Sequence, residues 1–341
     1  SVFRVGVVGA SGYAGAELLR LCHSHPDLEV AWATGDTQAG TLVGALYPSL
    51  AAAYPGLAFE SFEPGMAAGV DLVFLALPHG ASQRLMPAVL DAGPKVVDLG
   101  ADFRLRDPGV YEHWYGEVHV APELVGRFAY GLPELYRDDI AKADAVASAG
   151  CYPTAAALAL APLARAGLIE TTGIVVDAAS GISGAGRALK HATHFGTANE
   201  DFTAYGLLDH RHTPEMEQSV GATLLFTPHL APMTRGILAT CYARPAAGTS
   251  MAPEEVLGVL EDAYAGEPFV VVSPTSPSTK ATWGSNAVHL TARYDTRTGW
   301  ILVLAALDNL VKGASGQAVQ CANILLRLEE TTGLSAIGVY P

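Results

Sequence analysis

One cysteine stands where protein chains commonly place a reactive thiol. Cys151 belongs to the segment 150–154, Gly-Cys-Tyr-Pro-Thr, between the apolar run 143–149 and the helix-like stretch 155–166. A thiol at a helix N-terminus meets unpaired backbone N–H groups and the positive end of the helix dipole, which favour the thiolate. Pro153 suits the first helical turn, because no N–H partner is lost there. Cys151 is predicted to be a catalytic nucleophile, and the alternative is a small buried residue at a turn.

A nucleophilic thiol needs a base, and two of the eleven histidines lie close together. His210 and His212 flank Arg211, just before the step Thr213-Pro214-Glu215. Histidine titrates near neutral pH, so it can take the thiol proton and later protonate a departing oxygen. The alternative for either histidine is a structural or solvated loop residue. Glu215 is expected to begin a helix, since acids favour first turns, and orienting the histidine is its second interpretation.

A metal site is not predicted. The His-x-His pair has no cysteine or third histidine at ligand spacing. The four cysteines are far apart and show no Cys-x-x-Cys spacing, so neither zinc nor a disulfide framework is expected, and reduced thiols suit a cytoplasmic enzyme.

The first thirty residues predict a dinucleotide site. A strand over 3–8, a glycine turn, a helix over 16–22 and a strand over 28–33 follow one another. The spacing Gly-x-x-Gly-x-x-Gly differs from the usual Gly-x-Gly-x-x-Gly, but glycine still lets the backbone approach a pyrophosphate at a helix N-terminus. The alternative is a tight turn that needs positive φ. The candidate cofactor residues in the turn are Gly9, Ser11, Gly12, Tyr13 and Gly15.

The loop after the second strand bears on the choice of cofactor. It reads Thr34-Gly35-Asp36-Thr37 and contains neither arginine nor lysine. An acidic residue there usually meets the ribose hydroxyls of NAD, whereas a cation suits the extra phosphate of NADP.

Strands and helices alternate through residues 1–150, with strands at 71–77 and 95–99 around a helix at 81–92. This alternation predicts a parallel sheet covered by helices. From about 173 strands predominate, which predicts a mixed sheet in a second domain. The fold class is therefore α/β, a Rossmann-type domain plus a mixed α+β catalytic domain. The strands expected in the second domain are 174–179, 222–227, 236–243, 269–273, 287–294 and 300–307, with a helix at 253–265. A further amphipathic helix is expected at 314–327.

Cations and loop residues supply candidates for the rest of the site. Arg104 follows a strand and could bind a carboxylate, or instead pair with Asp98 or Asp102. Arg187 and Lys190 follow the glycine- and serine-rich loop 181–186 and could hold a leaving phosphate. The remaining candidates for the cofactor or substrate pocket, each at a strand end, are Pro78, Ser180, Gly181 and Asn309.

Composition excludes several classes of function. The chain has 341 residues, enough for two domains, and 20 basic against 34 acidic residues give a formal charge of -14. No Lys/Arg run is present, so nucleic-acid binding is not expected. The apolar stretch from Ala155 is interrupted by Pro162 and Arg165 and is too short to span a bilayer. The N-terminus lacks a signal-peptide pattern.

The negative net charge would repel an anionic substrate. Local cations must therefore attract such a substrate to the site.

The motifs occur together in one known family. Segments 9–15, 150–154 and 210–216, in that order, resemble the N-acetyl-gamma-glutamyl-phosphate reductases of arginine biosynthesis, and the resemblance covers essentially the whole chain. Further segments that fit are Leu77-Pro78-His79-Gly80, 98–104 (Asp-Leu-Gly-Ala-Asp-Phe-Arg), 130–134 (Tyr-Gly-Leu-Pro-Glu), 232–236 (Pro-Met-Thr-Arg-Gly) and 308–313 (Asp-Asn-Leu-Val-Lys-Gly).

The resemblance implies an NADP-dependent reduction of an acyl phosphate, with NAD possible, through a thioester on Cys151. It also implies that the hydroxyls of Thr34 and Thr37 hold the extra phosphate of NADP, since the loop 34–37 has no cation. It places the catalytic histidine in 210–212, where His212 is preferred because it adjoins the Pro-Glu step, and His210 comes second. It also implies that the helix from Ala314 returns to the first domain. The expected domains are 1–150 with 311–341 for the dinucleotide, and 151–310 for catalysis and assembly into a homodimer or homotetramer.

Three other functions remain open from the sequence. Aspartate-semialdehyde dehydrogenase shares the chemistry but fits the motifs less well. The related reductase of lysine biosynthesis acts on aminoadipate carried by an acidic protein, for which an acidic chain is poorly suited. A nucleotide-sensing protein without turnover belongs to a different class, and Cys151 with its two candidate histidines disfavours it.

Overall fold

The computed structural model describes residues 2–341 and divides the chain into two compact units. The first unit comprises residues 1–149 and 314–334, and the second comprises 150–313 and 335–341. The chain therefore leaves the first unit just before Cys151 and returns to it with the last helix, while the final residues rejoin the second unit. Among the described residues, no helix has both the length and the apolar character that a membrane crossing requires.

The first unit is built on a parallel six-stranded sheet in the order β2-β1-β3-β4-β6-β5. Its strands are β1 (Phe3–Val8), β2 (Leu28–Ala33), β3 (Leu72–Leu75), β4 (Lys95–Asp98), β5 (Phe128–Gly131) and β6 (Ala145–Ser148). Its α-helices are α1 (Tyr13–Ser24), α2 (Val43–Leu46), α3 (Ser82–Asp91), α4 (Pro108–Tyr115), α5 (Pro133–Lys142) and α10 (Gly316–Leu325). This order, with the reversal beside β1, is that of a doubly wound Rossmann-type domain, as the sequence predicts.

Helices bury both faces of this sheet. Along β3, Leu72 and Phe74 point into a core shared with α1 and α10. The alternate residues Val73 and Leu75 point into a second core shared with α3. Because successive side chains of a strand face opposite sides, a strand buried on both sides must be apolar throughout, which explains its Leu-Val-Phe-Leu sequence.

The second unit contains a mixed seven-stranded sheet in the order β11-β12-β13-β10-β7-β9-β8. Its strands are β7 (Ile174–Gly181), β8 (Thr203–Ala204), β9 (Leu224–Ala231), β10 (Ile237–Ala243), β11 (Val270–Val272), β12 (Val288–Asp295) and β13 (Trp300–Leu307). Its α-helices are α6 (Cys151–Arg165), α7 (Phe195–Ala198), α8 (Thr213–Val220) and α9 (Glu255–Ala263). The mixed sheet confirms the second half of the expected fold class. One strand is displaced from its expected position, because β9 begins at Leu224 and extends to Ala231.

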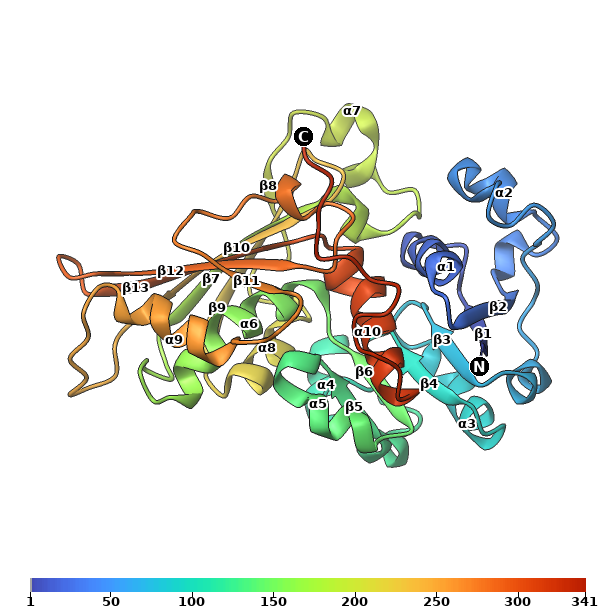
Figure 1. Ribbon diagram of the computed structural model, residues 1–341, viewed down its shortest axis with the longest axis horizontal. Helices are drawn as coiled ribbons and strands as arrows, with labels where there is room; N and C mark the ends of the chain where they lie inside the picture. Colours follow the sequence, from blue (N-terminus) through green and yellow to red (C-terminus); the bar gives the residue numbers. More distant parts are fainter. Residues whose placement is uncertain (1) are drawn as a thin grey trace. The chain divides into compact units, whose positions relative to one another are not determined.

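Helices α6, α8 and α9 pack on one face of this sheet, below it in Figure 1. Strand β10 shows the consequence. Ile237, Ala239 and Cys241 are fully buried under α6, whereas the alternate residues Leu238 and Tyr242 are only half-buried. The unit therefore has one closed face and one face with apolar side chains that its own helices leave partly exposed.

Candidate functional site

Cys151 is the first residue of α6, as the sequence predicts. Gly150 is the N-cap, and its carbonyl accepts hydrogen bonds from the backbone nitrogen of Thr154 at 2.9 Å and from Thr154 Oγ1 at 2.8 Å. Pro153 lies in the first turn and loses no hydrogen bond there. The thiol thus lies among the amide groups of a helix N-terminus.

Cys151 also differs from the other cysteines in exposure. It is half-buried, whereas Cys22, Cys241 and Cys321 are buried, and none of the four forms a disulfide. Burial raises the pKa of Cys22 and of Cys241 to about 12, so both stay protonated at neutral pH. Cys151 is therefore the one thiol of the chain that a reactant can approach.

A buried carboxylate joins the start of α6 to the start of α8. Glu215 is 1% exposed and lies in the first turn of α8. Its Oε1 accepts a hydrogen bond from the backbone nitrogen of Gly150 at 2.7 Å. The residue after Gly150 is Cys151, and His212 is the N-cap of α8. Glu215 does begin a helix, but its bond to Gly150 also fixes the two helix ends that carry the candidate nucleophile and base.

His210 and His212 form one compact group with aromatic rings. The Nδ1 of His210 accepts a hydrogen bond from the backbone nitrogen of His212 at 3.1 Å. The two imidazole rings are 4.9 Å apart, and Tyr152 lies 5.6 Å from His210 and 5.9 Å from His212, measured between ring centroids. Burial, with a smaller contribution from Arg211, lowers the pKa of His210 to about 4. His210 is therefore neutral at neutral pH.

Two tyrosines that sequence reasoning assigned no role lie beside this group. Tyr152 and Tyr205 share a hydrogen bond of 3.1 Å between their hydroxyls, and Tyr152 Oη also donates to the carbonyl of His229 at 3.2 Å. Burial raises the pKa of Tyr205 to about 12, and the charge of Cys151 acts in the same direction on both tyrosines. They stay protonated as hydrogen-bond donors near the thiol. The position of Tyr152 next to Cys151 was the only signal in the sequence for either of them.

A second group in this unit contains Ser180, Gly181 and Asn309. Asn309 is buried, its Oδ1 accepts from the backbone nitrogen of Gly236 at 2.7 Å, and its Nδ2 donates to Ser183 Oγ at 3.0 Å. Ser180 Oγ donates to the carbonyl of Gly181 at 3.0 Å. The structure thus brings these three predicted residues together, with the Asn309 amide anchoring the turns around it.

The two cations after this loop are placed differently. Arg187 is half-buried, whereas Lys190 is exposed. Lys190 Nζ donates to the carbonyl of Ala185 at 3.1 Å and so folds back over its own loop.

In the first unit, Arg104 is 9% exposed and its guanidinium is oriented by backbone carbonyls. Its Nε donates to Ser148 at 2.8 Å and its Nη2 to Leu99 at 2.6 Å. It joins the ends of β4 and β6, a structural role that sequence reasoning did not consider.

Asp102 organises the loop that contains Pro78. Its carboxylate accepts hydrogen bonds from the backbone nitrogen of Gly80 at 2.7 Å and from Ser82 Oγ at 3.1 Å. Tyr111 Oη donates to it as well, at 2.9 Å. Pro78 itself is exposed at the end of this fixed turn.

The glycine turn has the close packing that dinucleotide binding requires. Gly9 has φ of +78°, and a Cβ there would lie 2.5 Å from the carbonyl oxygen of Ala76. A Cβ on Gly15 would lie 2.4 Å from the Cα of Ala10, so the helix packs directly on the turn. Gly12, the N-cap of α1, has only the Gly9 carbonyl near its Cβ position, at 3.9 Å. The open space lies where a pyrophosphate would approach the helix N-terminus, and Tyr13 beside it is 37% exposed.

The residues expected at the adenosine ribose differ in accessibility. Thr34 is 1% exposed, and its Oγ1 accepts from the backbone nitrogen of Gly9 at 3.4 Å, so its hydroxyl braces the glycine turn. Thr37 is exposed. Ser11 approaches the same loop, since a Cβ on Gly35 would lie 2.9 Å from its Oγ.

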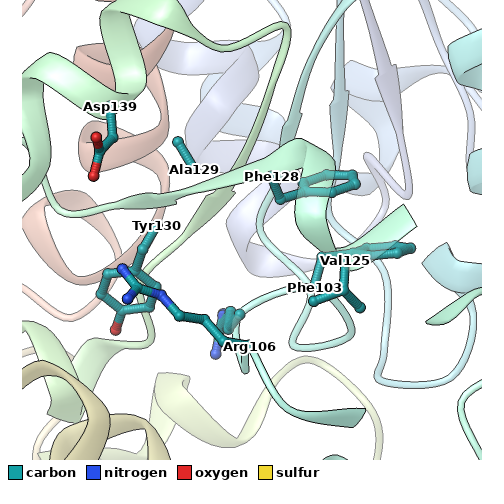
Figure 2. Close-up of a pocket in the computed structure, with 8 residues that line it drawn as sticks. Phe103, Arg106, Val125, Phe128, Ala129, Tyr130 and Asp139 are labelled. Carbon is teal, nitrogen blue, oxygen red and sulfur yellow. The ribbon is translucent and has the colours of Figure 1, made fainter. Parts of the chain in front are cut away.

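A small pocket of about 120 Å³ lies in the first unit. Figure 2 shows the side chains that line it, which are different residues from those around Cys151. Phe103 and Phe128 stack with centroids 4.2 Å apart on its apolar side, and Arg106, Tyr130 and Asp139 lie on its polar side. Arg104, Val125 and Ala129 complete the lining.

No metal centre is evident in residues 2–341, where no group of three or more His, Cys, Asp or Glu side chains could hold an ion.

Comparison with known proteins gives the same domain pattern. The family described as "Semialdehyde dehydrogenase, NAD binding domain" matches residues 4–143, and "Semialdehyde dehydrogenase, dimerisation domain" matches residues 151–309. The first unit is thus a nicotinamide-dinucleotide-binding domain. The solved structures that resemble this one include aspartate semialdehyde dehydrogenase II from Vibrio cholerae complexed with ASA, with a TM-score of 0.71 and 17% identity over 96% of this chain and 99% of that one. Aspartate semialdehyde dehydrogenase with NADP from Candida albicans has a TM-score of 0.69 and 14% identity over 96% and 99% of the two chains. These two show the fold.

Relatives in sequence are closer. An N-acetyl-gamma-glutamyl-phosphate reductase of Symbiobacterium thermophilum is 49% identical over 348 residues, covering 99% of each chain. Those of Desulforudis audaxviator and Geobacter sulfurreducens are 49% and 47% identical, each over the full length of both chains. Because both domain families match and full-length relatives are nearly half identical, the chain belongs to the semialdehyde dehydrogenase family, in its group of N-acetyl-gamma-glutamyl-phosphate reductases.

Proposed function

We propose that the protein reduces N-acetyl-glutamyl 5-phosphate to N-acetyl-glutamate 5-semialdehyde and phosphate, the reduction that its relatives' name describes, as a step of arginine biosynthesis. The observation that carries the proposal is Cys151, the one half-buried thiol, at the N-terminus of α6. A thiolate there can convert an acyl phosphate into a thioester, which splits a difficult reduction into two easier steps. The absence of disulfides fits our proposal that it works in the cytoplasm.

The chemistry follows from the residues of the second unit. His212 takes the proton of Cys151 Sγ, and the sulfur attacks the acyl carbon. The C–S bond forms, the C–O bond to phosphate breaks, and His212 returns the proton to the departing phosphate oxygen. A nicotinamide cofactor, when bound, supplies a hydride to the thioester carbon. The C–S bond of the resulting hemithioacetal then breaks, which releases the semialdehyde and regenerates the thiolate.

Anion recognition is assigned to three cations. We propose Arg104 for the substrate carboxylate, because two carbonyls hold its buried guanidinium in one orientation. Arg187 and Lys190 are proposed for the leaving phosphate, next to the loop 181–186. A chain with a formal charge of -14 needs such local cations to attract a substrate with several negative charges.

For the cofactor we propose NADP, with NAD as the alternative. The hydroxyl oxygen of Thr34 accepts a hydrogen bond from the Gly9 amide. We therefore propose that the hydroxyls of Thr37 and Ser11 bind the ribose phosphate, in the loop that also contains Asp36. Comparing kcat/KM for NADPH and NADH tests this choice. If NADH is preferred, and Asp36→Ala removes that preference, the assignment reverses to NAD.

We propose a homodimer or homotetramer that buries the half-exposed face of the second unit's sheet. Apolar side chains on that face include Val175, Leu238, Tyr242, Leu302 and Leu304. Partly exposed apolar side chains on one sheet face are typical of an interface, although Asp177 and Thr240 lie between them here. Analytical ultracentrifugation of Leu302→Arg should show dissociation into monomers if this face mediates assembly.

One assay distinguishes the proposed function from its alternatives. Purified protein is mixed with N-acetyl-glutamyl phosphate and NADPH, and NADPH consumption is followed together with phosphate release. Turnover with this substrate and not with aspartyl phosphate supports the proposal. Turnover with aspartyl phosphate alone supports aspartate-semialdehyde dehydrogenase, and turnover only with carrier-linked aminoadipyl phosphate supports the lysine enzyme. Cofactor binding without any turnover supports a nucleotide sensor.

A further inference from the structure

His210 makes a hydrogen bond that specifies which of its nitrogens carries the proton. Its Nδ1 lies 3.1 Å from the backbone nitrogen of His212, and a backbone nitrogen can only donate. Nδ1 must therefore be unprotonated, and in the neutral ring the proton is on Nε2. A ring held in this tautomer cannot use Nδ1 as a base without giving up its bond to His212.

The ring of His210 is fixed from several sides. Tyr152 on α6 and Phe226 on β9 meet it edge-on, at centroid distances of 5.6 Å and 5.1 Å. Tyr205 lies 5.6 Å away. Gly206 packs against it closely, since a Cβ there would lie 3.2 Å from His210 Cδ2. Side chains from a helix, a strand and the preceding loop thus hold the imidazole in one orientation.

The electrostatic surroundings maintain the acceptor. Burial of the ring, and then the charge of Arg211, disfavour the imidazolium, while Asp209 opposes them weakly. The pKa of His210 is accordingly lowered to about 4, so the lone pair on Nδ1 persists throughout the neutral range.

The bond acts directly on the residue that is proposed as the base. His212 is the N-cap of α8, and its backbone sets where its own imidazole points. Nδ1 of His210 bonds the amide two residues ahead, as the side-chain oxygen of asparagine does in an Asx-turn.

We propose that His210 is a positioning residue, which holds the backbone of His212 so that the imidazole of His212 is presented to Cys151. This inference rests on the proposed function, in which His212 is the base. It assigns the two histidines different tasks, one as a hydrogen-bond acceptor and one as the carrier of the proton.

The chain supplies a matched control for this arrangement. The Nδ1 of His194 accepts from the backbone nitrogen of Gly196 at 3.2 Å, in the same two-residue pattern at the N-cap of α7. His194 lies in an exposed segment. His194→Phe removes the same type of bond from a helix that carries neither Cys151 nor His212.

Two substitutions separate the hydrogen bond from the packing of the ring. His210→Asn keeps an acceptor at the position of Nδ1 and loses the ring, whereas His210→Phe keeps the ring and loses the acceptor. A correctly positioned acid–base group increases the rate by about 10² to 10⁴, and a misplaced group loses part of this increase. The kcat of His210→Phe should therefore fall by about 10- to 100-fold, with KM little changed. His210→Asn should retain most of kcat, and His194→Phe all of it.

A second measurement reports on the tautomer directly. The ¹⁵N resonances of the His210 ring in the wild-type protein should show an unprotonated Nδ1 and a protonated Nε2 at neutral pH. The opposite tautomer would overturn the inference, and this result does not depend on how any variant folds.

The outcomes also separate this inference from the function on which it rests. His210→Phe with the kcat of the wild type, or His210→Asn as inactive as His210→Phe, overturns the positioning role. If His212→Asn retains full kcat, the proposed base is wrong and the proposed mechanism fails. Loss of kcat in His212→Asn together with full kcat in His210→Phe leaves the function intact and removes only the role of His210.

Discussion

Glu215 Oε1 lies 2.7 Å from the backbone nitrogen of Gly150, so a carboxylate on α8 fixes the residue that precedes Cys151. Both partners are buried, and water cannot replace the lost bond if one is removed. The bond holds the start of α6 next to the start of α8. It thereby helps to set the distance between the side chains of Cys151 and His212, which lie at these two helix ends.

Glu215→Ala should therefore reduce both stability and turnover. An unsatisfied buried donor costs about 1–3 kcal/mol, which a denaturant titration can measure. Glu217→Ala is the control, because Glu217 lies on the same helix as Glu215 and makes the same kind of bond. Its Oε1 accepts from the backbone nitrogen of Leu224 at 3.0 Å, at the start of β9 and not at Gly150. Loss of stability in both variants with loss of kcat in Glu215→Ala alone is expected. Equal kcat in the two would assign Glu215 a purely structural role.

Cys151→Ser should abolish turnover and leave cofactor binding intact. A serine hydroxyl is much harder to deprotonate near neutral pH than a thiol, so the acyl-enzyme should not form. Mass spectrometry after mixing with the acyl phosphate should find an adduct on Cys151 in the parent only. An adduct on Cys22, Cys241 or Cys321, with full activity of the variant, would contradict the assignment.

His212→Asn should lower kcat more than His210→Asn does. Loss of general acid–base assistance costs about 10² to 10⁴ in rate, whereas asparagine at 210 retains the acceptor for the His212 amide. Steady-state kinetics of both variants measure the order. The reverse order of the two variants would make His210 the base.

Arg104→Leu and Arg187→Leu should affect different ligands. Removing a charge-assisted hydrogen bond costs about 1.5–3 kcal/mol, or roughly ten- to a hundredfold in affinity. In the reverse reaction, Arg104→Leu should raise KM for the semialdehyde, and Arg187→Leu should raise KM for phosphate. Arg104→Leu should also lower stability, because the carbonyls of Leu99 and Ser148 lose their donor. Equal changes in both constants would rule out the proposed division.

Asp98 should make the first unit less stable as pH rises. Burial raises the pKa of its carboxyl to about 7, and Oδ2 has no hydrogen-bond partner. The charge of Asp102 also raises this pKa, whereas hydrogen bonds from Gly100 and Ser82 and the charge of Arg104 lower it. The folded state therefore holds a proton that the unfolded state releases near pH 4, so stability falls between about pH 4 and 7. Asp98→Asn should flatten this dependence in thermal unfolding measurements. A variant with an unchanged slope would show that Asp98 does not titrate there.

Local patterns sufficed to predict much of the fold. The strand at 3–8, the glycine turn and the strand at 28–33 lie where periodicity and glycine spacing place them. β5 and α5 were not expected, because Phe128–Gly131 is only four residues long and Pro133–Lys142 has too few apolar positions for a helical pattern. Such elements depend on tertiary packing, which a local window does not contain.

The candidate site likewise contains residues that local sequence patterns indicate and residues that only tertiary packing brings together. Cys151 and the His210–His212 segment could be proposed from the sequence, because each combines a titratable side chain with a helix start. Tyr205 and the bond from Gly150 to Glu215 could not, because they join residues 53 and 65 positions apart through the packing of the unit. Thr34 shows the opposite limit, since its position in the motif suited a phosphate but its hydroxyl faces the Gly9 amide.

The last helix has a consequence for biosynthesis. α10 places Ala318, Val319 and Leu325 in the same core as Leu18 of α1 and Phe74 of β3. A ribosome makes residues 1–149 first, yet the helix that covers this side of their sheet is translated only after residues 150–313 of the second unit. The apolar surface that α10 covers in the folded protein therefore stays exposed on the nascent chain while more than 160 further residues are added. Chaperone dependence during synthesis, and its relief when α10 is moved next to residue 149 by circular permutation, are expected for a domain closed by its last-made segment.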